Sequence, residues 1–168
     1  SDTVDLQPRP ANFADLRQHL KHENADVILA AFGFNESFAG PKGLDSFEQS
    51  LRSYIEDLRT SAFNGETAPA LVLLSPIASE NIRGVAAADM NNANLEAYAK
   101  VMQRVANDLE IGFIDVFQPT RIAMESPGND LTINGVHLNE AGYALFAQQV
   151  YRGLFGKSAP KVREDLRQ

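Results

Sequence analysis

The chain has 168 residues, contains no cysteine and carries a formal net charge of −7 at neutral pH. This length suits one domain that buries a genuine core. The acidic balance argues against a nucleic-acid partner, because phosphates demand a basic face. The absence of cysteine excludes disulfides, thiolate metal sites and a cysteine nucleophile. It leaves the compartment open, since cytosolic, periplasmic and exported proteins can all lack cysteine.

No apolar stretch approaches the roughly 18 residues that a membrane-spanning helix needs. No signal peptide is visible at Ser1, and the chain does not begin with Met. We therefore expect a soluble protein without a transmembrane segment, either processed or excised from a larger chain.

The first predicted elements are a helix and a strand. Residues 12–24 carry apolar side chains at helical spacing, and Asn12 can cap this helix. Residues 26–32 form a continuous apolar run that ends at Gly33. A run without alternation predicts a strand that is buried on both faces of a parallel sheet.

The alternation of helix and strand continues through the middle of the chain. Residues 44–60 predict a helix, with Asp45 three places before Glu48 in a capping-box pattern. Residues 70–74 predict a second buried strand. The loop that follows, residues 77–89, is expected to shape the substrate pocket and to set specificity.

The next helix and strand follow the same pattern. Residues from about 91 to 109 predict a helix. Its inward face carries Leu95, Tyr98, Val101, Met102 and Val105. Residues 112–117 predict a third strand, and we expect a structural hydrogen-bonding role for Asp115 inside it.

The C-terminal part supplies a short helix and a loop over residues 118–138, then a last helix from about 140 to 154. Alternating strands and helices predict a three-layer α/β/α sandwich around a parallel sheet with right-handed crossovers. We expect one domain over residues 1–156 and a polar tail over residues 157–168.

Polar residues follow each predicted strand. In open parallel sheets, ligands bind beyond the carboxyl ends of the strands. The segments at this edge are Gly33–Ser37, Ser75–Glu80 and Asp115–Gln118. The sequence therefore places a candidate site at this edge of the sheet.

The first candidate segment is Gly33-Phe34-Asn35. Glycine at a strand end lets the backbone turn sharply and approach a ligand closely. The side-chain amide of Asn35 can then donate to a developing oxyanion. The alternative is that Asn35 only caps the turn.

The second candidate segment is Asn134-Gly135-Val136-His137, a turn sequence that leads into a helix capped by Asn139. A loop histidine in front of a rigid helix is a common position for a general base. The alternative is a histidine that makes only local hydrogen bonds.

Together these segments resemble two blocks of the SGNH (GDSL-type) hydrolase family of esterases and lipases. Gly33-Phe34-Asn35-Glu36 is similar to the third block. Asn134-Gly135-Val136-His137, followed by Leu-Asn-Glu-Ala-Gly-Tyr143, is similar to the fifth. The strand and helix order extends the resemblance over residues 1–156 and implies the flavodoxin-like SGNH fold, here without its first strand or two.

The resemblance implies hydrolysis of a carboxylic ester or of a carbohydrate O-acetyl group through a serine acyl-enzyme. His137 would be the general base, Asn35 an oxyanion donor, and Gly33 the residue that shapes the turn. Glu36 would hydrogen-bond around the site. Asn134 stands where the family commonly has the Asp that orients the histidine, and it lacks the charge that stabilises an imidazolium.

The nucleophile is the larger departure from the family. Ser1-Asp2-Thr3-Val4 fits the second block, where Ser1 would contribute a backbone oxyanion donor. The resemblance therefore implies that the catalytic serine and the first strands lie upstream, in a larger chain.

Two other readings stay open. Ser1 could be an N-terminal nucleophile that its own amine activates. Alternatively, the chain could be a non-catalytic module that binds a carbohydrate or a protein partner. In every reading no cofactor is implied, and no spacing resembles a metal-ligand set.

Overall fold

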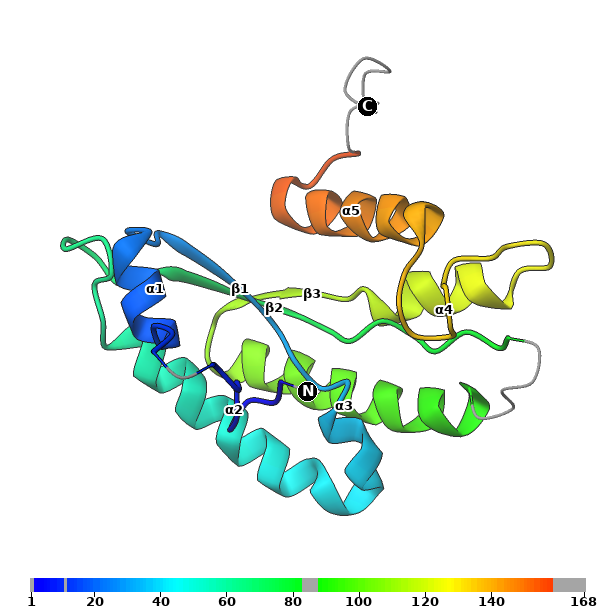
Figure 1. Cartoon of the computed structure of the whole chain (residues 1–168), viewed down its shortest axis with the longest axis horizontal. Coiled ribbons are helices and arrows are strands. Elements are labelled where there is room, and N and C mark those ends of the chain that lie inside the picture. Colours follow the sequence, from blue (N-terminus) through cyan, green and yellow to red (C-terminus); the bar gives the residue numbers. More distant parts are fainter. Residues whose placement is uncertain (1, 11, 83–87, 159–168) are drawn as a thin grey trace.

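The computed structural model of the chain describes residues 2–10, 12–82 and 88–158. A parallel sheet forms the middle layer of an α/β fold (Figure 1). Its strands are β1 (Val27–Ala31), β2 (Ala70–Leu74) and β3 (Gly112–Ile114), in the order β1-β2-β3. The predicted fold class is confirmed.

Helices cover the sheet on both sides (Figure 1). One side packs against α2 (Leu44–Arg59) and α3 (Ala88–Asp108), and the other side packs against α5 (Glu140–Phe155). The shorter elements are α1 (Leu16–His22), the 3-10 helix η1 (Glu36–Gly43) and α4 (Phe117–Glu125).

The main core lies between the sheet and the α2–α3 layer. Apolar positions of α2 recur at helical spacing and face the strands, so Leu51 and Ile55 are completely buried. The predicted inward residues of α3 are all buried as well: Leu95, Tyr98, Val101, Met102 and Val105.

The prediction that the first strand is buried on both faces was wrong. Exposure alternates along β1, and Val27 and Leu29 are 55% and 42% exposed. The alternate residues of the strand, Ile28 and Ala30, belong to the main core. The reason is the position of α5, which contacts β3 and leaves the outer face of β1 uncovered.

The third strand is shorter than predicted. It ends at Ile114 instead of residue 117, because the chain turns into α4. The Asp115 carboxylate accepts hydrogen bonds from the backbone N–H groups of Phe117 and Gln118, at 2.8 and 3.2 Å. Asp115 thus caps the start of α4, which agrees with the structural role expected for it.

One predicted helix start and one predicted helix cap were also wrong. Helix α1 begins at Leu16 with Asp15 as its cap, because Asp15 and Gln18 form the reciprocal capping box. Helix α2 begins at Leu44, as predicted, but the predicted capping box does not form, because Asp45 lies within the first turn and Gly43 stands at the cap position without a side-chain cap.

Helix α5 begins as predicted, with Asn139 accepting a hydrogen bond from the Gly142 N–H at 3.0 Å. It ends at Phe155, and Gly156 follows in the left-handed conformation that favours glycine. The predicted tail runs into residues 159–168, which lie outside the described part of the chain. Among residues 2–10, 12–82 and 88–158, no helix is long and apolar enough to cross a membrane.

Candidate active site

The first half of the candidate site is the turn after β1. Gly33 has φ = 93°, a conformation that residues with a side chain rarely adopt. A Cβ atom at Gly33 would lie 3.3 Å from the Met102 sulfur and 3.5 Å from Pro76. The backbone can therefore make this turn against the core only with glycine at this position.

Asn35 and Glu36 connect this turn to residues near the N-terminus. The Asn35 side-chain amide donates to the carbonyl oxygen of Asp2 at 2.7 Å. The two carboxylate oxygens of Glu36 accept from the Val4 N–H at 2.9 Å and from the Gly33 N–H at 3.0 Å. Glu36 thus joins residues 2–4 to the turn and makes the surrounding hydrogen bonds expected of it.

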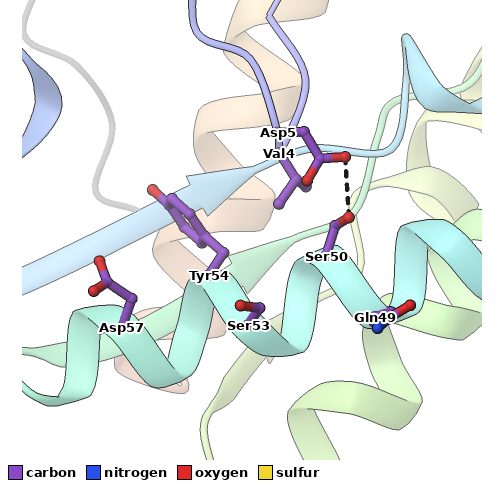
Figure 2. A pocket seen from close by; sticks show the side chains of 7 residues that line it. All are labelled: Val4, Asp5, Gln49, Ser50, Ser53, Tyr54 and Asp57. Carbon is purple, nitrogen blue, oxygen red and sulfur yellow. Dashed lines mark hydrogen bonds between the residues drawn. The ribbon is translucent and has the colours of Figure 1, made fainter.

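A second set of contacts fixes the N-terminal segment on α2 (Figure 2). Val4 is buried in the main core, and the Asp5 carboxylate accepts from the Ser50 hydroxyl at 3.0 Å. These residues border a pocket of about 390 Å³, which Tyr54 also lines. Burial, with a smaller effect from Asp57, raises the pKa of the Tyr54 hydroxyl. The pocket is lined by residues 4–5 and by α2, and His137 is not among its lining residues.

The second half of the site is the loop that carries His137. Thr132 and Leu138 form an antiparallel bridge, and the Ile133 N–H donates to the His137 carbonyl at 2.7 Å. At the turn between them, Gly135 has φ = 89°. The loop is thus a short hairpin that leads directly into the capped start of α5.

Asn134 holds the His137 imidazole. The Asn134 side-chain oxygen lies 3.0 Å from His137 Nδ1 and accepts from the His137 backbone N–H, also at 3.0 Å. An amide oxygen can only accept, so this contact assigns the ring proton to Nδ1. The second ring nitrogen, Nε2, then carries the lone pair that a general base needs.

The two halves meet in one cavity of about 590 Å³. Asn35, Glu36 and His137 all line it, together with the backbone segment around Asp2. Its apolar walls come from Phe32, Phe34, Pro76, Ile77, Val136 and Phe146. Side chains that are about a hundred residues apart in the chain therefore face the same space, as the sequence predicted.

The loop after β2 lies at the site, as the sequence predicted, and its first residues Ser75, Pro76 and Ile77 line the cavity. Sequence reasoning missed the buried polar side chains that hold this loop. Its backbone is fixed by buried polar side chains: Thr120 accepts from the Ala78 N–H at 2.9 Å, and Asn92 binds both backbone groups of Ser79. Glu80, at the end of this segment, is also buried. Nothing in the sequence distinguished these residues from solvated polar positions on a loop or a helix.

Ser75 is the one serine among the described residues that line the cavity. Its hydroxyl accepts from the N–H groups of Val116 and Phe117, each at 2.9 Å, and the residue is only 2% exposed. In the described part of the chain, no hydroxyl is hydrogen-bonded to the His137 ring. Ser1, the predicted backbone donor, lies outside the described residues.

Over residues 2–10, 12–82 and 88–158, no three His, Asp or Glu side chains are grouped so that they could hold a metal ion. The carboxylates at this edge of the sheet are instead engaged with backbone donors, as Glu36 and Asp115 illustrate.

Comparison with known proteins gives one family match. Residues 2–145 match the GDSL-like Lipase/Acylhydrolase family. A search of curated proteins found no match.

Solved structures share the fold at low sequence identity. An acetyl-xylooligosaccharide esterase from Geobacillus superposes with a TM-score of 0.63 at 19% identity, covering 85% of this chain and 65% of that one. A second variant of the same enzyme, the acetylxylan esterase Axe2 from Geobacillus stearothermophilus, gives 0.63 at 16%, covering 88% and 71%. The α/β hydrolase LAE5 from the metagenome of Lake Arreo, Spain, gives 0.63 at 19%, covering 90% and 67%. The chain thus spans 65% of the first of these esterases.

Proposed function

The chain belongs to the GDSL-like lipase/acylhydrolase family, and we propose that the whole protein hydrolyses esters through a serine acyl-enzyme. The observation that carries this proposal is the shared cavity, in which the Asn35 amide and the His137 ring line the same space. An ester carbonyl bound there would lie within reach of both an oxyanion donor and a general base.

In the proposed mechanism, His137 Nε2 takes the proton from a serine hydroxyl as its oxygen attacks the ester carbonyl. The oxygen of the tetrahedral intermediate becomes negative, and the Asn35 amide stabilises it. When the intermediate collapses, His137 returns the proton to the leaving alcohol. Water then releases the acid by the same steps, and the serine is regenerated.

Asn134 would fix the imidazole without supplying charge. Its oxygen keeps the proton on Nδ1, which leaves Nε2 free for catalysis. Variants of the acetylxylan esterase described as catalytic change a serine, an aspartate and a histidine, and the last two lie three positions apart. Asn134 and His137 have the same spacing.

We propose that the nucleophilic serine lies on a strand upstream of the residues described here. Within the described part of the chain, β1 pairs only with β2, so its other edge is open to a further strand. The outer face of β1 also exposes Val27 and Leu29. A parallel strand that paired with the free edge of β1 would end on the side of the sheet where Asn35 lies, beyond the carboxyl ends of the strands.

The substrate class that we propose is a small acyl ester, with an O-acetyl group on a carbohydrate as the first choice. The cavity has apolar walls from Phe34, Ile77 and Phe146, which suit a short acyl group. Its polar lining residues are Asp2, Asn35, Glu36, Ser75 and His137. Two of the solved structures with this fold are variants of one enzyme, Axe2, which is an esterase of acetylated xylan and xylooligosaccharides.

The test is fluorophosphonate labelling of the full-length protein, combined with hydrolysis of an acetylated sugar. We expect one labelled serine, and we expect His137→Ala to lower kcat by about 10⁴-fold or more without loss of folding. His22→Ala, at an exposed histidine of α1, is the matched control and should hydrolyse the ester normally. Full turnover by the His137 variant would refute the mechanism.

The second candidate is a non-catalytic carbohydrate-binding module. Two observations favour it: the Asn35 amide already donates to the Asp2 carbonyl, and Asn134 offers no negative charge to an imidazolium. This function predicts that titration calorimetry detects binding of an acetylated xylooligosaccharide that remains intact. Release of acetate from the same ligand would exclude it.

A further inference from the structure

Glu80 is a buried carboxylate at the junction of the two loops of the site. It is 5% exposed and lies three residues after Ile77, the last residue of this loop that lines the cavity. A buried carboxylate is costly unless hydrogen-bond donors surround it. The hydrogen-bond donors that contact Glu80 therefore show which segment of the chain it holds in place.

The Glu80 side chain binds the base of the His137 hairpin. Oε1 accepts from the Leu131 N–H at 2.9 Å, and Oε2 accepts from the Thr132 hydroxyl. The same hydroxyl then accepts from the Gly135 N–H at 2.9 Å. The carboxylate is thus connected through Thr132 to the turn residue next to Asn134.

The Glu80 backbone binds the other side of the same turn. Its N–H donates to the Gly135 carbonyl at 2.8 Å. A Cβ atom on Gly135 would lie 3.1 Å from the Glu80 carbonyl oxygen, so the two backbones are in close contact. Both polar groups of Gly135 are therefore fixed by Glu80, one directly and one through Thr132.

We propose that Glu80 is a positioning residue for the general base, an inference that rests on the proposed role of His137. By fixing Gly135, Glu80 holds Asn134 at the place where its amide oxygen meets His137 Nδ1. The ring proton then stays on Nδ1, and Nε2 stays free toward the cavity. Glu80 is not among the lining residues of the cavity and is hydrogen-bonded to the hairpin instead of the imidazole, so it acts only through the hairpin.

A carboxylate suits this position better than an amide. Two donors, the Leu131 N–H and the Thr132 hydroxyl, each require an acceptor oxygen. Glutamine would offer one acceptor and would turn an amide N–H toward the Thr132 hydroxyl. That hydroxyl would then lose its acceptor and receive two N–H groups, so the turn would loosen.

The first measurement is the tautomer of His137, read from the NMR shifts of its ring nitrogens in this protein. We expect the Nδ1–H tautomer to dominate in the wild type and a mixture of both neutral tautomers in Glu80→Gln. Thr132→Val should produce the same mixture, whereas Thr132→Ser should keep the wild-type tautomer. This readout does not require turnover, so it stays informative even if the protein hydrolyses no ester.

The second measurement is ester hydrolysis by the full-length protein. Glu80→Gln and Thr132→Val should each lower kcat by about tenfold and leave KM nearly unchanged. Because the two groups act as one unit, the double variant should lose no more than either single variant. Ile55→Val removes one methyl group from the distant core and should leave kcat and the tautomer unchanged while lowering stability.

The outcomes separate the two proposals. Absence of ester hydrolysis in the wild type would refute the proposed function, and the tautomer would still decide whether Glu80 positions the ring. Wild-type tautomer and kcat in both Glu80→Gln and Thr132→Val would overturn the positioning role. If Glu80→Gln fails to fold, Thr132→Val tests the same hydrogen bond with a side chain of the same shape.

Discussion

Carboxylates serve different purposes in two regions of this molecule. At the carboxyl edge of the sheet, Glu36 and Glu80 accept hydrogen bonds from backbone N–H groups and a hydroxyl. On the surface of the α2–α3 layer, Glu48 instead forms ion pairs with Arg52 and Arg104. The first two residues fix loop geometry, whereas Glu48 links two helices.

This difference predicts which property each region controls. Directed hydrogen bonds to backbone groups define where Asn35 and His137 lie, and catalysis is sensitive to such positions. An ion pair near solvent does little to fix the positions of its two side chains, and it usually contributes less than about 1 kcal/mol to stability. Substitutions at the site edge should therefore change rates, and substitutions on the α2–α3 surface should change stability.

After the loss expected for His137→Ala, the largest effect is expected at Asn35. Asn35→Ala should lower kcat by about 10²–10³-fold with a small change in KM, because the amide binds the oxyanion more strongly than the ground-state carbonyl. Initial rates on an acetyl ester provide the measurement. Asn35→Asp, which keeps the size but removes the donor, should show a similar loss. Equal weakening of substrate binding and turnover would instead assign Asn35 to binding alone.

A gain of activity is expected at Asn134. Asn134→Asp should raise kcat by about tenfold, because a carboxylate stabilises the imidazolium that forms in the transition state. The gain should be smaller than the loss caused by removing an Asp from a triad, since Asn134 already fixes the ring proton on Nδ1. The acid limb of the rate profile should move to higher pH. A lower rate at every pH would show that the amide, not a carboxylate, suits this hairpin.

The elements and the two halves of the site could be predicted from the sequence because they depend on local signals. The apolar run before Gly33 and the Asn139 cap before α5 both appear where the sequence placed them. The failures came from tertiary context. Exposure of Val27 and Leu29 depends on where α5 lies, and the end of β3 depends on the Asp115 side chain.

The buried polar residues that hold the loops of the site could not be predicted in the same way. Glu80 and Thr132 are polar residues that the fold buries because each finds partners far away in the sequence. Asn92 likewise lies on a helix, and its partner is the loop residue Ser79. A sequence pattern reports periodic apolar burial, but it does not report which polar side chain meets which backbone group.

The smallest effect is expected on the α2–α3 surface. Hydrogen bonds from Arg104 and then Arg52 lower the pKa of Glu48 in the folded protein. The ionised Glu48 therefore stabilises the folded state. This contribution is fully present above the carboxyl's unfolded pKa of about 4.3 and is lost as the pH falls through the lower folded pKa.

Glu48→Gln should therefore cost about 0.5–1 kcal/mol of unfolding free energy at neutral pH, and this cost should shrink in acid. Urea unfolding of both proteins, at neutral pH and at a pH below the folded pKa of Glu48, measures this difference in unfolding free energy. Glu56→Gln, at an exposed carboxylate of the same helix, is the control and should change stability little at either pH. Because Glu48 lies away from the cavity, its variant should keep wild-type kcat. A rate change at Glu48 as large as the one at Asn35 would break the distinction between the two regions.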